Sequence, residues 1–251
     1  MYLKIIAPCP ILNTHDFKKI FNKNKNFPLC DQKGHIRALE FIALQEDVCI
    51  EIQRFSDISK VIFPQYSNKP VYLDNRMTEI CNKLACKSVL HSKEEIIKEL
   101  KKCVGLPYIW GSNYYLGVDK FLSYYNPLLQ NKKNTWLLKG LDCSGLLYSA
   151  TNGYTPRNTS ALLHFGHGLK NNFSCIYELI SAVKPLDLIL HEGHVIIILN
   201  QNSCIESREK DGVIITNLEK RLLEIEKTRT FSKKISKNYF SNKSYTIRRW
   251  V

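Results

Sequence analysis

The chain has 251 residues, of which 44% are hydrophobic and 11% aromatic, and it carries a formal net charge of +13. At roughly 150 residues per domain, this length fits one large domain or two modest ones. The apolar content excludes a wholly disordered chain, and no run reaches the about 18 apolar residues of a membrane-spanning helix.

The first residues, MYLKIIAPCPILNTHD, contain one lysine and an apolar stretch that two prolines interrupt. A secretory signal has a basic start, an unbroken apolar stretch and a small-residue cleavage site. We therefore expect a cytoplasmic protein, with export by another route as the alternative.

The positive charge is concentrated in residues 220–251, which hold ten Lys or Arg and two Glu, a net charge of +8. Such a patch attracts nucleic acids, anionic lipids or acidic polymers. Lys, Asn and Ile are frequent throughout the chain, however, and no basic stripe alternates with aromatic residues. We expect no nucleic-acid partner.

Short apolar runs separated by turn residues fill the first third of the chain, a pattern typical of a small all-β unit. We expect this unit to span residues 1–88. The predicted strands are Tyr2–Ile6, Ile36–Leu44, Val48–Gln53, Lys60–Phe63 and Val71–Leu73.

Residues 89–251 read as helices followed by strands, which indicates an α+β domain. Ser92 and Glu95 form a capping box ahead of an amphipathic helix, and a second helix follows Asp142 and stops near Gly153. We expect residues 220–243 to form a helix or an exposed loop. The predicted strands form an antiparallel meander: Leu188–Leu190, Val195–Leu199, Cys204–Glu206, Val213–Thr216 and Tyr245–Trp250.

One of the nine cysteines stands in an unusual context. The count is odd and no pair has C-x-x-C spacing, so buried, reduced thiols are expected for most of them. Cys143, however, follows Asp142, a good helix N-cap, and precedes the small residues Ser144 and Gly145. In the first turn of a helix, the dipole and the free N–H groups favour the nucleophilic thiolate.

A cysteine nucleophile needs a base, and the base needs a group that orients it. His194 opens a strongly apolar strand, and Glu206 lies twelve residues later in the next candidate strand. Two adjacent antiparallel strands would hold these side chains together, with the carboxylate fixing the imidazole tautomer. The alternative is a buried core thiol at Cys143 and a surface histidine at His194.

Five short motifs occur in a fixed order: Gly105-Leu-Pro-Tyr-Ile-Trp-Gly111, Leu141-Asp-Cys-Ser-Gly145, Pro156-Arg157, Lys184-Pro-Leu-Asp-Leu188 and Gly193-His-Val195. Over about residues 90–215 this arrangement resembles the NlpC-type cysteine peptidases, bacterial peptidoglycan endopeptidases with a circularly permuted papain-like fold. The resemblance implies Cys143 as nucleophile, His194 as base and Glu206 in the third position, where the family often has histidine. It implies no cofactor.

The resemblance also implies the substrate, the stem peptides or muropeptides of peptidoglycan, cut between D-glutamate and the diamino acid. Tyr108 matches a tyrosine that lines the family's substrate site. Asp142 and Ser144 flank the nucleophile where the free amine of the stem peptide is held, and a carboxylate suits an ammonium group. The all-β unit is similar in size and position to the bacterial SH3-like modules that precede such domains, and we expect an SH3-like barrel.

The chain departs from the family pattern at three places. Gly111 is followed by Ser112 where the family has a second glycine, and Asn158-Thr159-Ser160 fits only loosely. The third is a long segment, Ser112 to Gly140, rich in Tyr and Leu. We expect this segment to fold down as a wall that narrows the cleft; the alternative is that it only adds stability.

Three other functions were considered. His164-x-x-His167 and His191-x-x-His194 could join Cys143 around zinc. We expect no metal site, because His164 and His167 lie in a Gly-rich stretch and His191 is expected to point away from His194. The others are a non-catalytic binder of cell-wall fragments and a lipid acyltransferase with the same permuted fold, a branch that usually carries an apolar tail.

Overall fold

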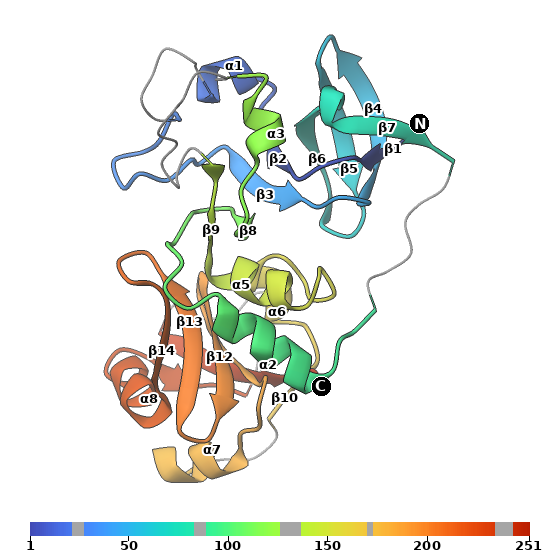
Figure 1. Ribbon diagram of the computed structural model, residues 1–251. Coiled ribbons are helices and arrows are strands. Elements are labelled where there is room, and N and C mark those ends of the chain that lie inside the picture. The colour runs from blue at the N-terminus through green and yellow to red at the C-terminus, as the bar shows by residue number, and fades with distance from the viewer. Residues whose placement is uncertain (22–27, 83–88, 126–136, 170–172, 234–242) are drawn as a thin grey trace. The chain divides into compact units, whose positions relative to one another are not determined.

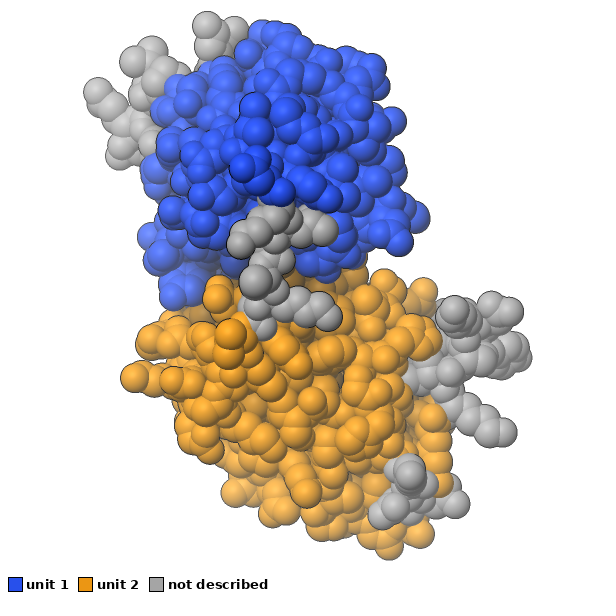
Figure 2. Space-filling model, turned by 90° about the vertical axis from the view of Figure 1, so that its right-hand side faces the viewer, with its two compact units in different colours: residues 1–87, 106–142 blue, residues 88–105, 143–251 orange. Residues whose placement is uncertain are grey.

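The computed structural model describes residues 1–21, 28–82, 89–125, 137–169, 173–233 and 243–251. The chain forms two compact units, coloured separately in Figure 2: residues 1–87 with 106–142, and residues 88–105 with 143–251. This division differs from the predicted domains 1–88 and 89–251, because residues 106–142 belong to the first unit. The predicted boundary itself lies outside the described residues.

The first unit is built on an antiparallel sheet, whose described strands follow the order β3-β2-β6-β5-β4-β1-β7 (Figure 1). In two of the strands, Tyr2–Ile5 and Ile58–Phe63, every second residue is buried. This is the pattern of a sheet with one face on the core. The strands are β1 (Tyr2–Ile5), β2 (Cys9–Leu12), β3 (Leu39–Ala43), β4 (Val48–Phe55), β5 (Ile58–Phe63), β6 (Ser67–Asp74) and β7 (Thr78–Cys81).

The five strands predicted for this region are confirmed, but β2 and β7 were missed. β2 contains Pro10, and proline normally excludes a residue from an interior strand because it lacks an N–H donor. Here β2 lies between β3 and β6 with all four residues buried, and Pro10 faces Ile42 in the register. Helix α1 (Phe17–Ile20) and the short helix η1 (Asn75–Met77) complete this part of the unit.

The segment that follows the Tyr-Ile-Trp motif packs into the first unit. It contains α3 (Asp119–Leu122) and the pair β8 (Asn113–Tyr114) and β9 (Gly140–Leu141). Phe121 is fully buried, with its ring 5.0 Å from that of Phe21, and Tyr125 belongs to the same core. The Asn113 side chain accepts from the Ile42 backbone N–H at 2.8 Å and donates to the Ile42 carbonyl oxygen at 2.9 Å. The described part of this segment therefore packs onto the β-rich core, and its role as a wall that narrows the cleft stays a prediction.

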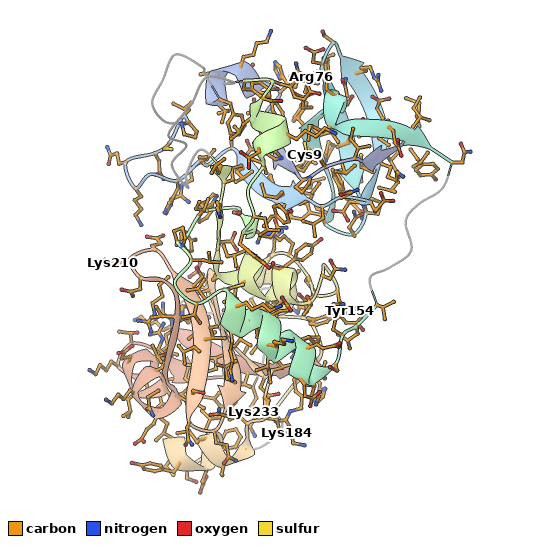
Figure 3. The ribbon with its side chains drawn as sticks, in the orientation of Figure 1. Cys9, Arg76, Tyr154, Lys184, Lys210 and Lys233 are labelled. Carbon is orange, nitrogen blue, oxygen red and sulfur yellow. The ribbon has the colours of Figure 1, made fainter. Side chains whose placement is uncertain are left out.

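Arg76 and Asp74 form the polar centre next to this segment. Arg76 is paired with the fully buried Asp74, and its guanidinium lies 4.2 Å from the ring centre of Tyr124. The Tyr125 hydroxyl donates to Asp74 at 2.7 Å. Figure 3 labels Arg76 beside α3. These contacts anchor the end of the described segment 106–125 to the sheet.

The second unit has a mixed sheet with helices packed against it, so the fold is of the α+β type. Ser92 and Glu95 make both bonds of the predicted capping box at the start of α2. Helix α5 packs on α2 and on strands β12 and β13, and α7 packs on α8. The helices are α2 (Lys93–Lys102), α5 (Cys143–Ala150), α6 (Thr159–Leu162), α7 (Ile176–Ala182) and α8 (Leu218–Glu226).

The described strands of this sheet follow the order β10-β16-β11-β12-β13-β14, with β15 beside β16. Figure 1 labels β10, β12, β13 and β14. The meander predicted for β11 to β14 is confirmed. The last strand is a correction, because β16 returns to pair with β11 instead of continuing past β14. The strands are β10 (His167–Gly168), β11 (Leu188–His191), β12 (His194–Asn200), β13 (Ser203–Arg208), β14 (Gly212–Asn217), β15 (Thr230–Phe231) and β16 (Ser244–Arg249).

β12 is buried along Val195–Leu199 because both faces of the sheet are covered. Ile196 and Ile198 belong to a core that they share with Leu218 and Leu222 of α8. A strand covered on both faces reads as a continuous apolar run, which is why this strand was clear in the sequence. In the described ranges, no helix is long and apolar enough to cross a membrane.

Candidate functional site

Cys143 is the first residue of α5 and is 6% exposed. Its sulfur lies 3.7 Å from the carbonyl oxygen of Gly193, and its side chain interacts electrostatically with that of His194. Gly193 forms the tight turn between β11 and β12 with φ +72°, a conformation that favours glycine. The turn therefore brings the start of β12 to the start of α5.

His194 and Glu206 form the contact that the sequence predicted. The imidazole Nε2 lies 2.7 Å from Glu206 Oε2, between the antiparallel strands β12 and β13. The His194 side chain is 18% exposed and that of Glu206 is fully buried. Nε2 donates to the carboxylate, which leaves Nδ1 as the ring nitrogen for the Cys143 side chain. Cys143, His194 and Glu206 are thus linked in this order.

Two arginines that the sequence analysis did not select also bind Glu206. Arg208 donates to Oε1 at 2.7 Å, and Arg221 of α8 donates to Oε1 at 2.8 Å and to Oε2 at 2.9 Å. Arg208 stands two residues after Glu206 on the same strand, a spacing that puts both on one face. Arg221 had no such signal, because its position depends on the packing of α8.

The charges around His194 favour its protonated form. Burial lowers the pKa of His194, but the hydrogen bonds with Cys143 and Glu206 outweigh burial and raise the pKa to about 9. Burial raises the pKa of Glu206, but the hydrogen bonds from His194, Arg208 and Arg221 outweigh burial and hold the pKa of this carboxyl well below its usual range. At neutral pH the imidazole of His194 is therefore a cation.

His191 does not point away from His194, which corrects the sequence expectation. The two residues are cross-strand partners, and their ring centres are 5.2 Å apart. Burial and the cation at His194 lower the pKa of His191 to about 4. His164 and His167 are exposed. Within the described ranges, no three His, Cys, Asp or Glu side chains are grouped to hold a metal ion.

The three residues predicted to bind substrate are divided between the units. Tyr108 belongs to the first unit, where its ring centre lies 5.8 Å from that of His35. Asp142, the last residue of that unit, is buried and accepts from the Gly111 backbone N–H at 3.1 Å. Ser144 belongs to the second unit.

Ser144 is buried in the first turn of α5, where its hydroxyl accepts from Arg157 at 2.9 Å. Arg157 is only 3% exposed, and a buried cation needs bonded partners. The Pro156-Arg157 motif therefore supplies a guanidinium that supports the helix carrying Cys143. The sequence pattern alone did not predict this role for Arg157.

Comparison with known proteins gave structural neighbours only. No protein-family model and no curated protein matches the chain. An NlpC/P60 family protein from Bacillus cereus is 16% identical over 99% of this chain and 63% of its own length, with a TM-score of 0.39. The chain thus spans less than two thirds of that protein.

Two mycobacterial structures cover half of this chain. The P60 domain of an antigen from M. avium subspecies paratuberculosis is 22% identical over 50% of this chain and 85% of its own, with a TM-score of 0.36. RipD from Mycobacterium tuberculosis is 19% identical over 50% and 87%, with a TM-score of 0.36, and is described as a non-catalytic NlpC/p60 domain protein adapted to peptidoglycan binding. These neighbours are NlpC/P60 proteins.

Proposed function

We propose that this protein is a cysteine peptidase of the NlpC type that hydrolyses an amide bond in the stem peptides of peptidoglycan. The observation that carries the proposal is the chain of contacts from Cys143 through His194 to Glu206. The ordered motifs around these residues support the same reaction. The bond we propose joins D-glutamate to the diamino acid.

The reaction needs four steps. The Cys143 thiolate attacks the scissile carbonyl, and the backbone N–H at the start of α5 is the natural donor to the oxyanion. The His194 imidazolium then protonates the leaving amine, which leaves an acyl-enzyme. The neutral imidazole takes a proton from water, and the hydroxide releases the acyl group. Glu206 keeps the imidazole oriented and stabilises its cation throughout.

Recognition of the substrate is assigned by the family resemblance to Tyr108, Asp142 and Ser144. A free N-terminal L-alanine carries an ammonium group, and Asp142, which is covalently adjacent to Cys143, is an acid that suits it. The stem peptide has a free N-terminal amine only after its amide bond to the glycan has been cut. We also propose that the N-terminal all-β unit is an SH3-like module and that it limits how much of the polymer enters.

Incubation of the purified protein with free stem tripeptides and tetrapeptides, followed by mass spectrometry, tests the proposal. We expect a dipeptide of L-alanine and D-glutamate together with a fragment that starts at the diamino acid, and we expect neither with Cys143→Ala. Cys175→Ser, at an exposed cysteine, is the matched control and should cut normally. Peptide binding without cleavage would contradict the proposal in favour of a binder, and acyl transfer to an added lipid amine would favour the transferase.

A further inference from the structure

The carboxylate of Glu206 is saturated with donors. An ionised carboxylate has about four lone-pair sites, and each Glu206 oxygen has two donors at 2.7–2.9 Å: Arg208 and Arg221 on Oε1, and His194 and Arg221 on Oε2. The side chain is fully buried. Glu206 therefore has no site left for substrate or water, and its influence reaches the reaction only through His194.

The sharing of Oε2 has an electrostatic consequence. His194 and Arg221 both donate to this oxygen, so a second cation lies beside the imidazolium and competes for the same negative charge. A buried carboxylate bound by His194 alone would hold the imidazolium more strongly, because its charge would not be divided. Glu206 thus stabilises the protonated form of His194, and Arg221 weakens this stabilisation.

We propose that Arg221 is a positioning residue that fixes the Glu206 carboxylate against His194 and, by competing for Oε2, limits how strongly this carboxylate stabilises the imidazolium. The effect of Arg221 on His194 does not depend on the proposed function; only its consequence for the reaction rests on that function. An imidazolium that is held too tightly is a poor acid, so Arg221 favours proton transfer to the leaving amine.

The other charged groups around His194 must be included. Arg221 also binds Glu224 at 3.0 Å, and Arg208 lies 3.6 Å from Asp211, so each arginine is partly neutralised on its solvent side. The ionisable groups that face His194 or its partners are Cys143 from α5, His191 from β11, Glu206 and Arg208 from β13, Arg221 and Glu224 from α8, and Arg229 beyond α8. A purely structural role is the alternative, with Arg221 joining α8 to β13.

The test is a titration of the His194 imidazole by NMR in the Cys143→Ala protein, which removes the thiolate contribution. Arg221→Met should raise the midpoint by about half to one pH unit, because a cation is lost and the carboxylate is freed. Glu206→Gln should lower the midpoint. Lys220→Met, which removes an exposed cation one residue away on α8, should leave it unchanged.

An unchanged or lowered His194 midpoint in Arg221→Met would overturn the proposal, since a structural anchor would give no upward shift. Arg221→Gln keeps one donor but no charge, and the same upward shift in this variant decides the matter if the methionine variant does not fold. The titration needs no substrate and no turnover. Its outcome is therefore independent of whether the protein hydrolyses stem peptides.

Discussion

His191 and His194 are direct cross-strand partners with ring centres 5.2 Å apart, yet their environments shift their pKa values in opposite directions. Burial lowers the pKa of His194, but its hydrogen bonds with Cys143 and Glu206 outweigh burial and raise this pKa to about 9. Burial and then the neighbouring His194 cation lower the pKa of His191 to about 4. Of the two imidazoles in the turn, only that of His194 carries a charge at neutral pH.

Cys143 is expected to be the most reactive thiol at mildly acidic pH. Protonated His194 favours a thiolate there, whereas burial raises the pKa of Cys103 and of Cys204 to about 11. Brief iodoacetamide treatment at pH 5.5–6 followed by peptide mass spectrometry should find the label on Cys143. Cys175 is exposed and serves as the internal control for simple accessibility. Faster labelling of Cys175 would remove the basis for a thiolate at Cys143.

The two histidines of the turn should differ in their importance for hydrolysis. His194→Ala removes the base and acid, and we expect a loss of about 10²–10⁴-fold in kcat/KM. His191→Ala removes a neutral ring that contacts His194, and its effect should stay within about tenfold. Both rates are measured on free tripeptide. A comparable loss in the two variants would mean that the base has been assigned wrongly.

The rate of hydrolysis should fall on the alkaline side as the pH rises past the pKa of His194, about 9. Glu206→Gln keeps an acceptor for Nε2–H but removes the anion, so this limb should move to lower pH by about one unit or more. The folded state raises this pKa above its ordinary value, so the stabilisation is complete below about 6.5 and is lost as the pH rises toward 9. Denaturation at several pH values should show a weaker dependence in this interval for Glu206→Gln. An unmoved alkaline limb would show that the third member lies elsewhere.

Phe121→Ala should destabilise the first unit by about 3–5 kcal/mol, because it empties a fully buried site that contacts Phe21. Leu116→Ala, in the same segment but 58% exposed, should change the free energy of unfolding by less than about 0.5 kcal/mol. Calorimetry measures both. Replacement of the segment from Ser112 to Gly140 by a flexible linker is therefore expected to unfold the first unit. The predicted narrowing of the cleft by this segment has to be tested with substitutions of its exposed residues instead. Equal free energies of unfolding in the two variants would contradict the burial of Phe121 in this core.

Some of the positive charge in residues 220–251 stabilises the fold. Arg249 donates to both oxygens of the buried Asp187, at 2.6 and 2.9 Å. Arg249→Met leaves this buried carboxylate without its cationic partner and should cost about 3–5 kcal/mol in the free energy of unfolding. Lys210, which is exposed and labelled in Figure 3, is the control, and Lys210→Met should be nearly neutral. Similar melting temperatures of the two variants would contradict a structural role for Arg249.

The sequence by itself determined several of the local elements and the contact between His194 and Glu206. Ser92 and Glu95 carry their capping signal within four residues, and the apolar run of β12 is continuous because both its faces are covered. His194 and Glu206 were predictable as neighbours because a short turn between adjacent antiparallel strands leaves little freedom in their pairing. Each of these depends on residues close together in the chain.

Only the tertiary structure decided where distant segments pack. Residues 106–142 follow the first helix of the second unit, yet Phe121 and Tyr125 bury their rings against the N-terminal sheet, which no local pattern specifies. β16 pairs with β11 across more than fifty residues, and Pro10 occupies an interior strand despite its missing donor. Arg221 reaches Glu206 because Leu218 and Leu222 fix α8 against the sheet. Burial of apolar surface is non-directional, so the partner of each apolar face is determined by the whole chain.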